Sequence, residues 1–181
     1  MAKRSNKMDC RELSLRGTIT LTDHARVVDE RIFEYVSPDR TVAWKVTGAW
    51  MWPKTVQENT VADVQGALTG SLTTDTVGNW AEMTVTDNRE FGWIYTGFYV
   101  RSAGVNECLV PIGTPIAEMQ FLLDPQTVIT NDIFFSGQFL TEDTNSPVRE
   151  WNYLITLESM RISEQESILQ QLKGIGQDVE N

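Results

Sequence analysis

Residues Val42 to Trp52 read VAWKVTGAWMW, and this stretch decides the fold class of the chain. Successive side chains of a β-strand point to opposite faces, so every second residue lies on the same face. One face then carries the indoles of Trp44, Trp50 and Trp52. Indoles left in water would forfeit roughly 1.5–3 kcal/mol each. We expect this face to be buried against a second layer of chain, which predicts a β-sandwich.

Alternating patterns recur along the chain and predict further strands. Residues Leu13 to Thr22 and Trp80 to Thr86 alternate, and Val148 to Ile162 is expected to form the last long strand. Val61 to Thr73 also has helical spacings, but its glycines and threonines favour a strand. Both faces of Phe91 to Val100 are apolar, so we expect this strand inside a sheet or against an interface. The pattern predicts about eight to ten strands, which is typical of an all-β sandwich or barrel.

The composition limits the class of protein. The chain has 181 residues, which suits one domain, and no apolar run approaches the ~20 residues of a membrane span. The N-terminal MAKRSNKMDCREL has no apolar segment after its basic start, so we expect no secretion signal and synthesis in the cytoplasm. The net charge of −10 argues against a general nucleic-acid binder, because phosphate contacts need clustered Lys and Arg.

Residues 1–12 are the local exception to this acidic balance. Lys3, Arg4 and Lys7 make a small basic arm ahead of the first expected strand. Such an arm is either a solvated chain terminus or a segment that touches nucleic acid or a neighbouring subunit. The sequence leaves both interpretations open.

Motifs for catalysis, metal binding and cofactor binding are absent from the sequence. Cys10, Cys108 and His24 are its only Cys and His residues, too few for a zinc site of about four ligands. The two cysteines are either free thiols or a disulfide pair. Neither a GxSxG nucleophile motif nor a phosphate-binding glycine loop occurs. We therefore expect no enzyme, no metal and no cofactor, although carboxylate pairs from distant strands would leave no local signature.

Six tryptophans raise the alternative of a carbohydrate-binding protein. Exposed indole rings on a sandwich can stack against sugar rings, whereas indoles on strand faces usually belong to the core. Trp52 and Trp80 lie near the ends of expected strands, so we take them as the candidates for sugar stacking.

The last segment, residues 163–181, changes from a strand pattern to a helix pattern. A capping box at Ser163 to Glu166 predicts where a helix begins, and Gly174 predicts where it ends. The helix carries an apolar stripe made of Ile168, Leu169 and Leu172. A helix of about ten residues does not persist alone in water, so this stripe must pack on its own sandwich or on a neighbouring subunit.

The chain resembles a viral coat subunit of the single jelly-roll type in three features. These are the basic start MAKRSNK, the strands expected over residues 13–162, and the ending YLITLESMRISEQESILQQLKG. The resemblance implies an all-β fold, a two-sheet antiparallel, jelly-roll-like β-sandwich with a short C-terminal α-helix. It also implies a non-enzymatic virion structural protein, made in the host cytoplasm, whose copies self-assemble into an icosahedral shell around the viral genome.

Under this resemblance, two sets of residues acquire roles. The arm residues Lys3, Arg4 and Lys7 would face the genome, and the helix stripe would join subunits. The brief arm and the acidic balance depart from many small coat proteins, so we expect weak genome contact and mainly protein–protein contacts. The alternatives are a carbohydrate-binding sandwich, such as a receptor-binding spike or fibre module or a lectin-like domain, and a β-barrel enzyme acting through carboxylates.

Overall fold

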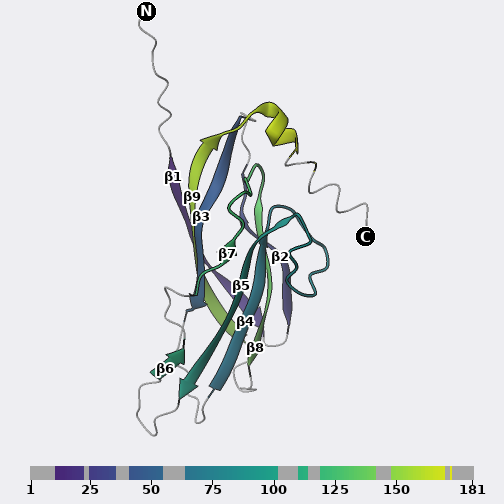
Figure 1. The fold of residues 1–181 in the computed structure, drawn as a ribbon. Coiled ribbons are helices and arrows are strands. Elements are labelled where there is room, and N and C mark those ends of the chain that lie inside the picture. The colour runs from purple at the N-terminus through teal and green to yellow at the C-terminus, as the bar shows by residue number, and fades with distance from the viewer. Residues whose placement is uncertain are drawn as a thin grey trace, which may run out of the picture.

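The computed structural model describes residues 11–22, 25–35, 41–54, 64–101, 110–113, 119–141, 148–169 and 172. The strands in these ranges are β1 (Glu12–Thr22), β2 (Arg26–Phe33), β3 (Val42–Pro53), β4 (Val64–Thr73), β5 (Glu90–Arg101), β6 (Val110–Gly113), β7 (Leu122–Leu123), β8 (Ile133–Thr141) and β9 (Val148–Arg161). They form two sheets, ordered β1-β9-β3 and β2-β8-β4-β5-β6, with β7 paired to β5 (Figure 1). The predicted all-β, two-sheet antiparallel sandwich with a short C-terminal helix is confirmed.

The strands pair in a nested order. The first strand β1 pairs with the last strand β9, β2 pairs with β8, and β4 pairs with β5. Residues 119–129 complete the nesting, because they bridge to β3 at Trp44–Ile129 and Trp50–Gln120. The chain therefore follows one long hairpin folded over onto itself, which makes the sandwich jelly-roll-like.

Residues 119–130 also close one side of the sandwich. Trp44 and Ile129 exchange two backbone hydrogen bonds of 2.9 and 2.7 Å, and Phe121 donates its N–H to Ala49 at 2.9 Å. Between these contacts, β7 leaves β3 and pairs with Trp93 of the other sheet. The segment thus covers the free edge of β3 and links the two layers, which leaves fewer unpaired backbone groups exposed.

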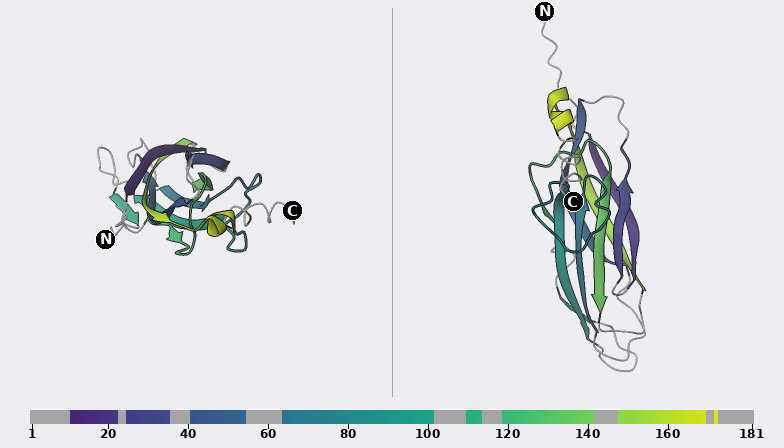
Figure 2. Two further views of the ribbon diagram at one scale, coloured as in Figure 1. Left: turned by 90° about the horizontal axis from the view of Figure 1, so that it is seen from above. Right: turned by 90° about the vertical axis from the view of Figure 1, so that its right-hand side faces the viewer.

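A single large cluster of apolar side chains fills the space between the sheets. Viewed along the strands, the two sheets curve around this shared interior (Figure 2). The largest fully buried side chains include Trp151, Phe91, Phe135 and Phe139. The rings of Phe139 and Trp151 come from opposite sheets, and their centroids lie 5.5 Å apart, a favourable aromatic distance. The core therefore takes side chains from both sheets, as alternation within each strand requires.

The strand Val42–Pro53 forms as expected, but the prediction that its tryptophan face is buried as one unit is wrong. The pairing of β3 with β9 shifts register between Val46 and Gly48, and such a bulge moves later side chains to the opposite face. The buried face of β3 near and beyond the bulge consists of Val46, Ala49 and Met51. Trp50 and Trp52 fall on the other face and are half-buried. The Trp50 ring lies over Gly48, where an added Cβ would clash with it.

The prediction of a strand over Trp80 to Thr86 is also wrong. Residues 74–89 connect β4 to β5 without strand structure. A strand here would place Ala81, Met83 and Val85 together on one face. In the structure, Ala81 and Val85 are instead exposed in a loop. The loop makes polar contacts with residues of the sheet and with its own residues. These contacts take the place of the hydrogen bonds that a strand would make with its neighbours.

Candidate functional site

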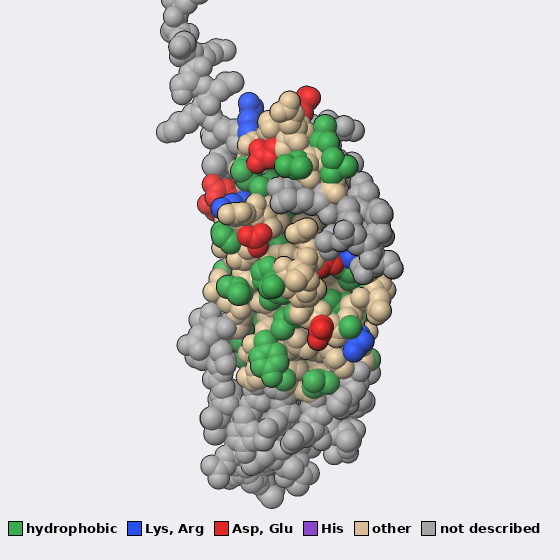
Figure 3. All heavy atoms as spheres, turned by 45° about the vertical axis from the view of Figure 1, so that its right-hand side comes forward, with side chains coloured by type: hydrophobic (Ala, Val, Ile, Leu, Met, Phe, Trp, Pro, Cys, Tyr) green, Lys and Arg blue, Asp and Glu red, His purple; other side chains and the backbone are tan. Residues whose placement is uncertain are grey.

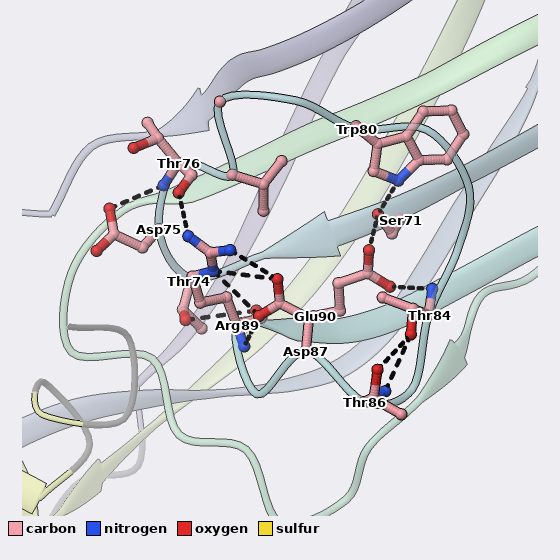
Figure 4. Close-up of polar contacts among 12 residues, drawn as sticks. Ser71, Thr74, Asp75, Thr76, Trp80, Thr84, Thr86, Asp87, Arg89 and Glu90 are labelled. Atoms are coloured by element: carbon pink, nitrogen blue, oxygen red, sulfur yellow. Dashed lines mark hydrogen bonds and ion pairs between the residues drawn. The ribbon is translucent and has the colours of Figure 1, made fainter. Parts of the chain in front are cut away.

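The β4–β5 loop, residues 74–89, folds over the outer face of the larger sheet. Leu72 of β4 points into the core, so its neighbour Ser71 points to the outside of the sheet. The indole Nε1 of Trp80 donates to Ser71 Oγ at 2.8 Å, and Trp80 is only 3% exposed (Figure 4). The loop is therefore packed against the sheet by a buried tryptophan.

Glu90, the first residue of β5, is the centre of this packing. Its carboxylate accepts hydrogen bonds from Ser71 Oγ at 3.2 Å and Thr84 N at 3.0 Å (Figure 4). It also accepts one from Trp93 Nε1 at 2.7 Å. Burial raises the pKa of Glu90 above its usual value, the three hydrogen bonds oppose this shift, and the charge of Asp87 adds to it. One buried carboxylate thus connects the loop, β4 and β5.

A buried ion pair holds the other arm of the loop. Arg89 donates from Nη2 to Asp87 at 2.8 Å and from Nη1 to the carbonyl oxygen of Thr76 at 3.0 Å. Burial acts to raise the pKa of Asp87, but the hydrogen bonds and charge of Arg89 outweigh it and hold the pKa below its usual value. Because both side chains are largely buried, removing either one would leave an uncompensated charge inside the protein.

Asp29 of β2 fastens the tip of the loop. Its two carboxylate oxygens accept the backbone N–H groups of Val77 and Gly78 at 2.8 and 2.9 Å. Its own N–H donates to Ser136 Oγ at 2.9 Å, and its φ of 58° lies in the left-handed region that Asp tolerates better than most residues. The loop is thereby attached to three strands of the larger sheet.

The hydrogen-bond partners of Glu90, Asp87 and Arg89 indicate a structural role for these residues. Glu90 is 6% exposed, and its hydrogen-bond partners are all parts of the protein fold, so its carboxylate is directed at the loop and away from solvent. The ion pair of Asp87 and Arg89 is directed in the same way. We assign the whole network the role of fixing loop 74–89 on the sheet.

The C-terminal helix is the second candidate site, and it follows directly after β9. Residues 164–169 and residue 172 are helical in the described part of the chain. Ser163 accepts the N–H of Glu166 on its Oγ at 3.1 Å, so the predicted N-terminal cap is confirmed. Ile162, just before the cap, is buried with Ala43 and Val128, which anchors the base of the helix to the sandwich.

The helix turns its apolar stripe outward. Ile168, Leu169 and Leu172 are 47%, 57% and 54% exposed, whereas Ser167 is 3% exposed. A serine takes the inward position, so packing of this stripe on its own sandwich covers only about half of its surface in the described part of the chain. Three exposed aliphatic side chains on one side of a short helix make it a candidate protein-binding surface.

The other residues singled out from sequence have mixed outcomes. Lys3, Arg4 and Lys7 lie outside the described residues, as do Cys10, His24 and Cys108. Trp80 is wrong as a candidate for sugar stacking, because its ring is buried and its Nε1 is used by Ser71. Trp52 is half-buried on the outer face of the smaller sheet, where stacking remains a prediction.

Sequence reasoning missed the exposed residues over β5. Tyr95 and Leu122 are 75% and 72% exposed, and Val85 in the β4–β5 loop is 79% exposed. The available signal was the strand Phe91 to Val100 with two apolar faces, which predicted a strand inside a sheet or against an interface. The structure confirms the first half of that prediction, because β5 lies between β4 and the short strands β6 and β7.

No family model, curated protein or solved structure matches the chain. No helix within the described residues has the length and apolar character needed to span a bilayer. Over the same part of the chain, His, Cys, Asp and Glu side chains form no group of three or more that could hold a metal ion. The function must therefore be argued from the fold and its two candidate sites.

Proposed function

We propose that this protein is a virion structural protein, a jelly-roll capsid subunit that self-assembles into an icosahedral shell around a viral genome. The observation that carries the proposal is the outward apolar stripe Ile168, Leu169 and Leu172 on a jelly-roll-like sandwich. A fixed helix with its apolar side in solvent needs a partner, and copies of the same chain are the partner that a shell supplies.

The size of the stripe suits a repeated contact. Covering the exposed half of three aliphatic side chains contributes about 2–4 kcal/mol, which is smaller than the estimated cost of bringing two proteins together. A single such contact gives a weak dimer at most. In a closed symmetric assembly every subunit can give its stripe to one neighbour and receive the stripe of another, so a shell is stable where a single contact is weak.

The charge of the chain bears on the role of the genome. A net charge of −10 opposes contact with phosphates over most of the surface, so Lys3, Arg4 and Lys7 are the residues that we propose for weak genome contact. The proposal then places the folded protein in the virion after synthesis in the host cytoplasm. It also predicts that shells form without nucleic acid, because protein–protein contacts hold them together.

The helix stripe gives a direct experiment. The variant Ile168→Ser, Leu169→Ser, Leu172→Ser should keep the melting temperature of the wild type, because all three side chains are already exposed, and should remain monomeric in sedimentation velocity. The matched control Gln165→Ser changes an exposed uncharged residue of the same helix and should assemble like the wild type. Equal assembly by the stripe variant and the control would overturn the proposal.

A second candidate function is carbohydrate binding, and Tyr95 is the observation that favours it. The Tyr95 ring is 75% exposed on a sheet face, and its register partner on β4 is Thr69, a possible hydrogen-bond donor to a sugar. Two results together would favour this function over the shell. The wild type would stay monomeric and bind sugars on a glycan array, and the variant Tyr95→Ala would lose that binding.

A further inference from the structure

We infer that the helix stripe of one copy binds a second apolar surface on another copy, formed by Val85, Trp93, Tyr95 and Leu122 over β5. We call these four residues the receiving patch. The inference rests on the proposed function, because it states which surface of the neighbouring subunit the helix meets. It assigns the contact as heterologous, with different surfaces of the chain facing each other.

The receiving patch is continuous across the outer face of the larger sheet. Leu122 of β7 is the register partner of Trp93 on β5, and Tyr95 is two residues further along β5 on the same face. Val85 follows Thr84, whose carbonyl oxygen accepts the Trp93 indole N–H at 3.3 Å. Three of the four side chains are more than 70% exposed, and half-buried Trp93 lies between them.

The patch is built in advance of any partner. Trp93 Nε1 donates to the buried Glu90 at 2.7 Å, and the backbone N–H of Thr84 donates to the same carboxylate at 3.0 Å. The loop that carries Val85 is therefore fixed against the strand that carries Tyr95. A preorganised surface loses less conformational freedom on binding, so the network that fixes the loop on the sheet also prepares this surface for an interface.

The areas of the two surfaces favour a second copy as the occupant. From their exposures, the helix stripe offers on the order of 300 Å² of apolar surface and the receiving patch roughly 450 Å². Each is less than the about 800 Å² per partner of a standard stable interface. Each copy carries one of each surface, so in a closed ring it makes the contact twice, once with the stripe and once with the patch.

The two surfaces do not cover each other within the described part of one copy. Both remain exposed in the folded chain, and the helix lies at the end of the sandwich where β1 and β3 begin, following β9 of the smaller sheet (Figure 1). The patch belongs to β5 and β7 of the larger sheet. On one face of the molecule, hydrophobic and uncharged polar groups cover most of the described surface, with only scattered charged side chains (Figure 3).

The charges beside the two surfaces predict a salt dependence. Glu164 and Glu166 are exposed on the helix, and Glu82 is exposed on the loop that carries Val85. Like charges brought together by the contact repel each other, and salt screens that repulsion. Assembly through this contact should therefore strengthen as the ionic strength rises, which is the reverse of a contact made by ion pairs.

The inference is tested by disulfide trapping between copies. In the background Cys10→Ser, Cys108→Ser, protein with Leu169→Cys is mixed with a separately tagged protein carrying Leu122→Cys. The control mixture replaces Leu122→Cys by Thr18→Cys, which is exposed on β1 of the other sheet. The expected result is a linked pair that forms at least about tenfold faster than in the control, because a specific contact raises the effective concentration.

A second measurement covers the chance that the background without cysteine fails to fold. In the otherwise unchanged chain, Leu122→Ser with Tyr95→Ser should raise the concentration needed for assembly at least about tenfold and leave the melting temperature unchanged. The receiving patch is overturned if the wild type assembles, the Leu122→Cys mixture links no faster than the Thr18→Cys mixture, and the serine variant assembles like the wild type. That outcome leaves the proposed function standing. A wild type that stays monomeric throughout overturns both.

Discussion

Replacement of the buried carboxylate Glu90 gives the sharpest prediction for the fold. The variant Glu90→Ala removes the acceptor for three donors, of which Ser71 is buried and Thr84 and Trp93 are partly buried. In this variant the Trp93 indole N–H can still donate to the carbonyl oxygen of Thr84, and the Ser71 hydroxyl can rotate toward another acceptor. The backbone N–H of Thr84 is therefore the donor that is left without an acceptor. An orphaned buried donor costs about 1–3 kcal/mol and the cavity adds to it, so we expect a loss of about 3 kcal/mol in the free energy of unfolding.

Glu90→Gln is the matched control, because it keeps the shape and one acceptor oxygen, and it should lose about 1 kcal/mol or less. For a chain of this length, the loss in Glu90→Ala corresponds to a fall of about 6–12 °C in melting temperature. Urea unfolding followed by tryptophan fluorescence measures both variants. If Glu90→Ala is as stable as Glu90→Gln, the hydrogen-bond network does not hold the loop as we describe.

The pKa of Glu90 adds a pH dependence to the same comparison. Its folded pKa is raised above the unfolded value, so its contribution to stability is present in full below the unfolded pKa and is lost as pH rises through the folded pKa. The stability of the wild type relative to Glu90→Gln should therefore fall as pH rises above the usual pKa of a glutamate. A difference that rises with pH would contradict the raised pKa that burial gives Glu90.

Three further changes test other parts of the fold. Asp29→Ala should cost about 2 kcal/mol and Asp29→Asn clearly less, because Asn tolerates the left-handed φ and keeps one acceptor; thermal melting and limited proteolysis of loop 74–89 measure this. Gly137→Ala should cost about 2–3 kcal/mol in urea unfolding, because its Cβ would lie 2.8 Å from the Thr69 carbonyl oxygen. Asp87→Asn should cost about 2 kcal/mol at neutral pH by leaving Arg89 buried without its carboxylate. That cost should shrink as pH falls through the lowered pKa of Asp87, as unfolding at several pH values would show.

Alternation predicted the strands whose pairing is regular. Residues 13–22 alternate strictly, and β1 pairs along its whole length with residues 148–158 of β9 without a register shift. The bulge at Val46 and Gly48 could not be predicted in the same way, because one extra residue reverses the faces and leaves no pattern of its own. The tryptophans beyond the bulge were therefore assigned to the wrong face.

Contacts between distant residues account for the other failures. Trp80 to Thr86 alternates like a strand, yet its positions are set by Ser71 and Glu90 across the sheet. The helix stripe was found by its spacing, but only the structure shows that it points outward. The receiving patch joins a loop, a strand and β7, so no single stretch of sequence contained it.

Cryo-electron microscopy of the purified wild-type protein tests most directly whether this sandwich exists to bind copies of itself. Samples without nucleic acid, over a range of protein and salt concentrations, should contain closed particles of uniform size, and more of them at high salt. Isolated subunits at every concentration and every ionic strength would contradict self-assembly and leave the sandwich without the role that we propose.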